Sequence, residues 1–169
     1  MSKLAEEDLE FDFSDARQAF RFDCDDLHGA SSKAQRVDFI AEYDDYYLFI
    51  EVKDPDNPGA SNPEAFMAKL RNQKLERSLA GKFRDTLFFR HLTSEHNQNK
   101  SIKYVVLLSC TAIEPAMLMA KRDLLYREIP LENPAWRNHR VADCILVNLQ
   151  QYRDLFGENS VRRISEGAA

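Results

Sequence analysis

The chain has 169 residues, of which 44% are hydrophobic, and its formal net charge is −5. This length is typical of one domain with a real core, and the acidic balance counts against a broadly basic nucleic-acid surface, though not against a local basic channel. No apolar run approaches the ~20 residues that cross a bilayer, and the acidic N-terminal residues lack the apolar segment of a signal peptide. Three scattered cysteines show neither a disulfide framework nor zinc spacing with the histidines. We therefore expect a cytoplasmic protein with no membrane contact.

The first half of the chain predicts strands separated by loops. In chain order we expect a short helix within 1–15, with Phe11 and Phe13 in a strand or a docking tail, a strand over 19–24, a loop over 25–35, a β-hairpin over 36–53 and a loop over 54–63. The hairpin is predicted because both arms are rich in β-branched and aromatic residues around a polar Asp44-Asp45. The loop that follows contains three prolines and one glycine, which exclude a regular element.

The second half alternates predicted helices with buried strands. We expect a helix over 63–90 with an interruption at Gly81, a polar loop over 91–101, a strand over 102–110, a helix over 114–126, an irregular segment over 129–139, a strand over 141–148, a helix over 150–156 and a polar, disordered tail over 158–169. This order predicts one α/β domain over residues 1–157. Its mixed β-sheet begins as an antiparallel meander and continues through crossover units, flanked by helices.

The hairpin brings charged residues of opposite sign together. If Asp44-Asp45 forms a two-residue turn, Tyr43 pairs with Tyr46, and Asp38 then lies opposite Glu51 at ~5 Å between Cβ atoms. Two carboxylates so close repel each other unless a positive charge lies between them. A divalent cation with oxygen ligands meets that need, and Lys53 lies on the same strand face as Glu51. The alternative is a hairpin with one solvated, charged face.

The hairpin residues resemble the PD-(D/E)XK nuclease superfamily: Val37-Asp38 is followed, after twelve intervening residues, by Glu51-Val52-Lys53. The resemblance implies a restriction-endonuclease-like core and a metal-dependent nuclease that hydrolyses phosphodiester bonds in nucleic acid, with DNA favoured. It also implies that Asp38, Glu51 and the Val52 carbonyl bind Mg²⁺ or Mn²⁺, and that Lys53 assists the attacking water. The chain departs from the family pattern in lacking a proline before Asp38.

A further acidic ligand often precedes the first strand of that family. Its candidates here are four acidic residues, Glu6, Glu7, Glu10 and Asp15, and the sequence does not distinguish them.

The helix after the hairpin carries the candidate nucleic-acid contacts. Lys69, Gln73 and Arg77 are expected on one side of it, where they either bind the phosphate backbone or form a solvated helix face. A homodimer or a larger complex is a further expectation, because cutting both strands of a duplex often needs two sites. The alternative function is a non-catalytic interaction module of the same fold, or a subunit of a nucleic-acid-processing or defence complex. A third reading is a small acidic binding protein whose hairpin matches the motif by chance.

Overall fold

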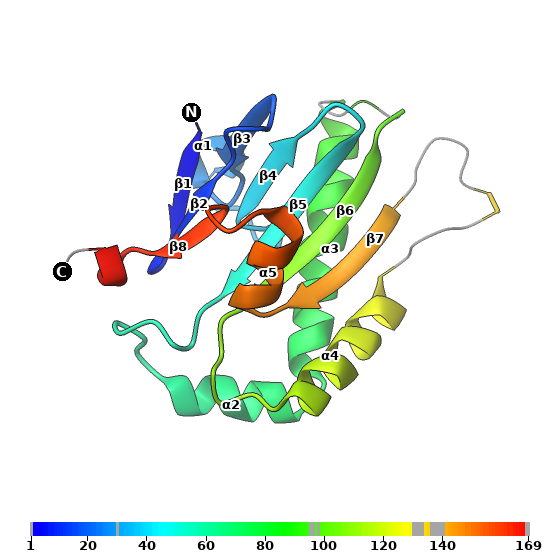
Figure 1. Cartoon of the computed structure of the whole chain (residues 1–169). Helices are drawn as coiled ribbons and strands as arrows, with labels where there is room; N and C mark the ends of the chain where they lie inside the picture. Colours follow the sequence, from blue (N-terminus) through cyan, green and yellow to red (C-terminus); the bar gives the residue numbers. More distant parts are fainter. Residues whose placement is uncertain are drawn as a thin grey trace.

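The computed structural model describes residues 2–29, 31–94, 97, 99–129, 134–135 and 141–167 of the chain. Its elements in chain order are β1 (Lys3–Glu6), β2 (Leu9–Asp12), β3 (Gln18–Arg21), α1 (Asp25–His28), β4 (Phe39–Glu42), β5 (Tyr46–Lys53), α2 (Pro63–Arg71), α3 (Lys74–Leu92), β6 (Ser101–Leu108), α4 (Pro115–Glu128), β7 (Val141–Val147), α5 (Leu149–Phe156), β8 (Val161–Arg163) and the 3-10 turn η1 (Ser165–Gly167). The fold is α/β with mixed strand directions and flanking helices, as the sequence predicts (Figure 1).

The main sheet has the strand order β3-β4-β5-β6-β7. Strand β4 runs antiparallel to both of its neighbours, β3 and β5, whereas β5, β6 and β7 run parallel to one another. The change of direction follows from the connections. A tight turn joins β4 to β5, while the parallel strands are joined by crossovers that contain α2 with α3 and then α4. The predicted meander followed by crossover units is confirmed.

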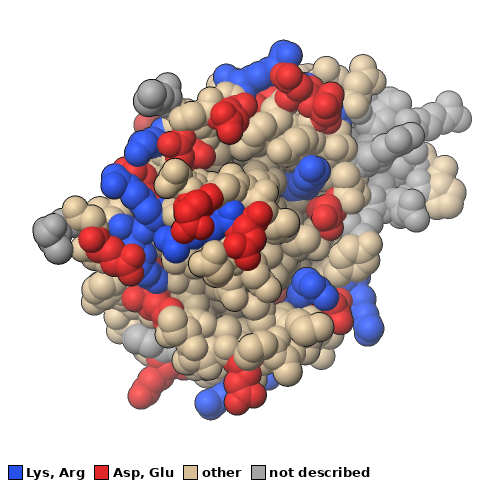
Figure 2. All heavy atoms as spheres, in the orientation of Figure 1, with Lys and Arg blue, Asp and Glu red and all other residues tan. Residues whose placement is uncertain are grey.

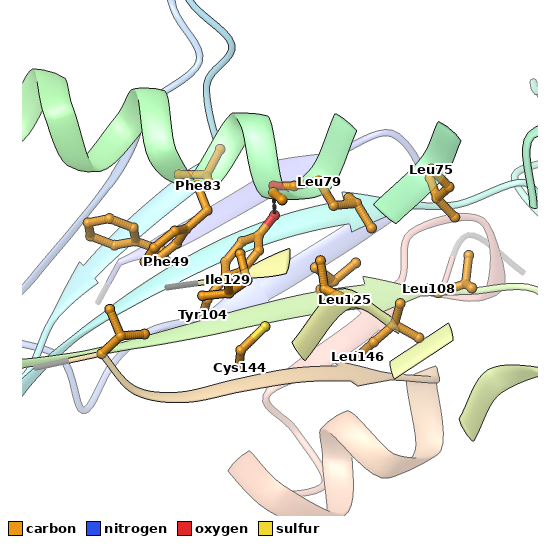
Figure 3. Packing of buried hydrophobic residues seen from close by; sticks show 14 of the residues in the cluster. Phe49, Leu75, Leu79, Phe83, Tyr104, Leu108, Leu125, Ile129, Cys144 and Leu146 are labelled. Atoms are coloured by element: carbon orange, nitrogen blue, oxygen red, sulfur yellow. Dashed lines mark hydrogen bonds between the residues drawn. The ribbon is translucent and has the colours of Figure 1, made fainter. Parts of the chain in front are cut away.

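Two hydrophobic cores cover the two faces of this sheet, because side chains alternate along each strand. On one face α3 and α4 pack over sheet residues such as Phe49, Tyr104 and Leu146, which Figure 3 shows from close by. On the other face a small sheet of order β1-β2-β8, together with α5, packs over residues such as Phe39 and Ile50. The molecule is therefore built in three layers, and Glu51 points toward the α3 layer between two neighbours that point away from it.

Both ends of the chain differ from the prediction. The N-terminal region forms β1 and β2 instead of the predicted short helix, because Leu9, Phe11 and Phe13 are buried at a spacing of two residues. Phe11 lies in β2, so of the two predictions for this residue the strand is confirmed. The predicted disordered tail contains β8, which pairs antiparallel with β2 and buries Val161. Polar composition concealed this strand because only one of its side chains enters the core.

The predicted long helix is two helices, and it breaks at Asn72-Gln73 instead of at Gly81. The Asn72 side chain accepts a hydrogen bond from the Lys74 backbone N–H at 3.0 Å, which turns the chain between them. Gly81 lies inside α3, where a Cβ atom would approach Gln35 Oε1 to 2.8 Å. The short α1 also interrupts the predicted loop over 25–35. The predicted irregular segment over 129–139 and part of the predicted loop over 91–101 lie largely outside the described residues.

Within the described ranges, no helix has the length and apolar character needed to cross a membrane.

Candidate metal and phosphodiester site

The register of the β4–β5 hairpin is the predicted one. Phe39 pairs with Ile50, and the Tyr43 backbone N–H donates to the Tyr46 carbonyl at 2.9 Å. One position beyond the Phe39–Ile50 pair, Asp38 faces Glu51. The Val52 backbone N–H donates to Asp38 Oδ2 at 2.6 Å, which fixes this carboxylate against β5.

Both carboxylates are buried, with Asp38 5% exposed and Glu51 fully inaccessible. Burial, followed by the charge of Glu51, raises the pKa of Asp38 to about 7, against the opposing effects of Lys82, Lys53 and the Val52 N–H. Glu51 Oε2 is buried and has no hydrogen-bond partner among the described residues. The pair is therefore an electrostatically unfavourable arrangement that needs positive charge.

Lys53 supplies part of that charge, as the sequence predicts. Its Nζ donates to Glu51 Oε1 and, at 3.0 Å, to the Val52 carbonyl. Burial lowers the pKa of Lys53, but the charges of Glu51 and Asp38 outweigh this effect, so the net shift is upward and the ammonium stays protonated.

Lys82 of α3 is a site residue that the sequence analysis missed. Its Nζ lies 2.7 Å from Glu51 Oε1 and 3.8 Å from Asp38 Oδ1, so one ammonium spans the two carboxylates. A signal existed: Lys82 is three residues after Leu79 and four before Thr86, both of them buried, so it belongs to the inward face of the helix. A lysine on the buried face of a helix indicates a buried acidic partner.

Three contacts hold α3 over the hairpin. The Thr86 hydroxyl accepts the Val37 backbone N–H at 3.1 Å, directly beside Asp38, and the Asp85 carboxylate accepts the Gln35 N–H at 2.9 Å. From the sheet, the Tyr104 hydroxyl donates to the Leu79 carbonyl at 3.0 Å, the dashed line in Figure 3. Lys82 is thus placed by a helix that is tied to the segment before β4 and to β6.

The three predicted nucleic-acid contacts lie elsewhere. Lys69, Gln73 and Arg77 are exposed, and Gln73 precedes the first turn of α3. Within the described part of the chain, Asp38 and Glu51 form their ion pairs with Lys53 and Lys82 and with none of these residues. The exposed residues Lys69, Gln73 and Arg77 are therefore separate from Lys82, the lysine of α3 that contacts the two carboxylates.

Of the four upstream acidic candidates, Glu7 is the one coupled to the site. Glu6 pairs with Arg21, Glu10 pairs with Lys3 and Arg162, and Asp15 is exposed between β2 and β3. Glu7 occupies the turn between β1 and β2 with a φ of 53°; burial and then Asp54 raise its pKa, and Lys53 opposes this shift. Glu7 nevertheless does not complete a metal cluster, because the described residues contain no group of three or more His, Cys, Asp or Glu side chains suited to hold an ion.

The donor set fits a hard divalent cation held by few protein ligands. Asp38, Glu51 and the Val52 carbonyl offer only oxygen atoms, and the unpartnered Glu51 Oε2 is a buried lone-pair donor with no other use in the described chain. Mg²⁺ commonly keeps several waters and takes one or two carboxylates, so a third acidic ligand is not required. Bound there, the ion would offset the repulsion between the carboxylates.

Comparison with known protein families, with curated proteins and with solved structures finds no match to this chain. The chemistry of the site is therefore inferred from its side chains and their geometry.

Proposed function

We propose that this chain is a metal-dependent nuclease of the PD-(D/E)XK type, which hydrolyses phosphodiester bonds in nucleic acid, with DNA as the favoured substrate. The observation that supports the proposal best is the buried Asp38–Glu51 pair, opposed across a hairpin and joined by Lys53 on the same face. A mixed sheet that begins with an antiparallel meander and has helices on its flank agrees with the restriction-endonuclease-like core that the motif implies.

Each residue of the site has a role in this proposal. Asp38, Glu51 and the Val52 carbonyl would hold Mg²⁺ or Mn²⁺. The ion, when bound, supplies an activated water and an electrophile for a phosphoryl oxygen. Lys53 would orient that water and compensate negative charge that develops on the phosphate. The closed hairpin and α3 exclude bulk water from the carboxylates, which strengthens every charge interaction there.

The exposed side of α2 and α3 would contact the nucleic-acid backbone through Lys69, Gln73 and Arg77. A local contact of this kind suits an acidic protein better than a broad basic surface would. Figure 2 shows one face of the molecule, on which basic and acidic side chains lie next to one another.

A cleavage assay tests the proposal directly. Supercoiled plasmid, linear DNA and RNA are each incubated with the protein in Mg²⁺ and then in Mn²⁺. We expect cleavage by the native chain and by the control Lys33→Ala, an exposed lysine outside the site, and none by Lys53→Ala. Cleavage by Lys53→Ala at the native rate would refute the assigned role, and no cleavage of any substrate would favour the alternative below.

The second candidate function is a non-catalytic interaction module, alone, as a homodimer or as a subunit of a larger complex. It is favoured by the two lysines that already compensate the carboxylates and by the absence of a third acidic ligand in the described ranges. For such a module, replacing Asp38 and Glu51 together by Asn and Gln should leave partner or nucleic-acid binding unchanged. In either case the free cysteines Cys24, Cys110 and Cys144 suit a reducing compartment such as the cytoplasm.

A further inference from the structure

The Lys82 ammonium lies where a cation shared by the two carboxylates would be expected. Its Nζ is 2.7 Å from Glu51 Oε1 and 3.8 Å from Asp38 Oδ1, and its side chain is mostly buried. It enters from α3, a different element from the hairpin that carries the acids.

Lys53 stands in a different relation to the same acids. It contacts Glu51 and the carbonyl of its own neighbour Val52, and within the 4 Å limit of an ion pair it does not reach Asp38. Both ammoniums converge on Glu51 Oε1, while Glu51 Oε2 keeps no hydrogen-bond partner in the described structure. Lys53 thus contacts only one of the two carboxylates, whereas Lys82 lies within ion-pair distance of both.

We propose that Lys82 is a built-in stand-in for the metal ion: its ammonium compensates Asp38 and Glu51 in the metal-free protein and has to leave for a divalent cation to bind. The inference rests on the metal site of the proposed function and adds a regulation of that site. A divalent cation between the same two carboxylates would lie within a few ångströms of the Lys82 ammonium and repel it. Lysine can leave such a position because its charge sits on a flexible four-carbon stem.

The stand-in has a measurable consequence for metal affinity. Every metal ion that binds must displace Lys82, so the native affinity is lowered by the strength of the Lys82 ion pairs. Lys82→Met keeps the length and apolar stem of the side chain but removes the competing charge. We expect Mn²⁺ to bind Lys82→Met about tenfold more tightly than the native chain, or better. Lys82→Arg, which keeps the charge, should bind no more tightly than native.

Calorimetric titration of Mn²⁺ into the native chain, Lys82→Met, Lys82→Arg and the control Lys33→Met provides the test. Equal or weaker binding by Lys82→Met overturns the proposal, and so does the absence of Mn²⁺ binding in all of them. If Lys82→Met does not fold, a crystal structure of the native chain with Mn²⁺ decides. Lys82 Nζ displaced from Glu51 supports the stand-in, and Lys82 Nζ retained at its present position beside a bound ion overturns it. Tighter binding by Lys82→Met without cleavage of any nucleic acid would refute the nuclease and leave the stand-in supported.

Discussion

Arg163 forms a bidentate ion pair with Asp54, the residue that directly follows Lys53, although the two are 109 positions apart in the chain. Its Nη1 and Nη2 lie 3.0 and 2.7 Å from the Asp54 carboxylate oxygens, and the same guanidinium donates to Ser109 Oγ and to Asp8 Oδ2. This one side chain of β8 joins the ends of β5 and β6 to the turn between β1 and β2. The small sheet is thereby fixed to the strand that carries Glu51 and Lys53, and Figure 1 shows β8 beside β2.

Replacing Arg163 by Met should destabilise the protein by roughly 3–5 kcal/mol, because Asp54 would remain buried without its partner. Urea unfolding followed by circular dichroism measures the change. Arg162→Met is the matched control: Arg162 is an exposed neighbour paired with Glu10, so its loss should change little. Equal effects of the two substitutions would show that the Asp54 pair does not anchor the C-terminal segment.

The stability of the native chain should fall as the pH rises from about 4 to about 7. Asp38 has a folded-state pKa of about 7, above its ordinary value of 3.8, so between these values the folded state holds a proton that the unfolded state releases. The difference corresponds to about 4 kcal/mol at most. The variant Asp38→Asn cannot titrate at this position and serves as the reference. When the unfolding free energies of both proteins are measured at pH 5 and at pH 8, the native chain should be less stable relative to the variant at pH 8 than at pH 5. A difference that does not change with pH would contradict this expectation.

Lys121 and Glu76 form a buried ion pair between α4 and α3, with 2.8 Å between Nζ and Oε1. Lys121→Met should cost roughly 3–5 kcal/mol, since it leaves the Glu76 carboxylate buried and uncompensated. Adding Glu76→Gln should recover much of that loss, because the remaining charge is removed. Thermal unfolding of the two single variants and the double variant gives the coupling energy between Lys121 and Glu76. If the effects of the two substitutions were additive, the interaction between the two side chains would not contribute to stability.

Thr86→Val should destabilise the chain by about 1–3 kcal/mol, because the buried Val37 N–H loses its acceptor while the side-chain volume is kept. The loss should also weaken Mn²⁺ binding, because the segment that carries the metal ligand Asp38 is then held less firmly. Urea unfolding and Mn²⁺ calorimetry are the measurements. Thr93→Val, at the exposed end of α3, serves as the control and should leave Mn²⁺ affinity unchanged.

Lys53→Ala should abolish cleavage while leaving Mn²⁺ affinity similar or higher, because it removes an ammonium bound to Glu51 but no metal ligand. Asp38→Ala, by contrast, should lose both cleavage and Mn²⁺ binding. Rates on linear DNA together with Mn²⁺ calorimetry separate the two outcomes. If Lys53→Ala lost metal binding with its circular dichroism spectrum intact, the roles assigned within the site would be wrong.

The local features of the site could be predicted from the sequence. Alternation along two short arms and an Asp44-Asp45 turn define the hairpin register, and the register alone places Asp38 opposite Glu51 and Lys53 beside it. The order of strands and helices likewise defines the mixed sheet, because a tight turn forces antiparallel neighbours and a crossover permits parallel ones. These predictions hold because each depends on residues close together in the chain.

Two features, the position of Lys82 and the strand β8, were decided only by the tertiary structure, because both depend on partners far apart in the sequence. Lys82 became a site residue because Thr86 and Tyr104 dock α3 on the hairpin and sheet, and helix periodicity by itself does not say which acids an inward lysine will meet. The polar C-terminal segment became a strand because β2 offered a free edge and Asp54 a buried charge, neither of which its own composition reveals. Short-range alternation thus determined the positions of Asp38, Glu51 and Lys53 on their hairpin. Long-range packing determined the position of Lys82 and the formation of β8. The physical reason is that burying a charge is favourable only where the fold supplies its partner.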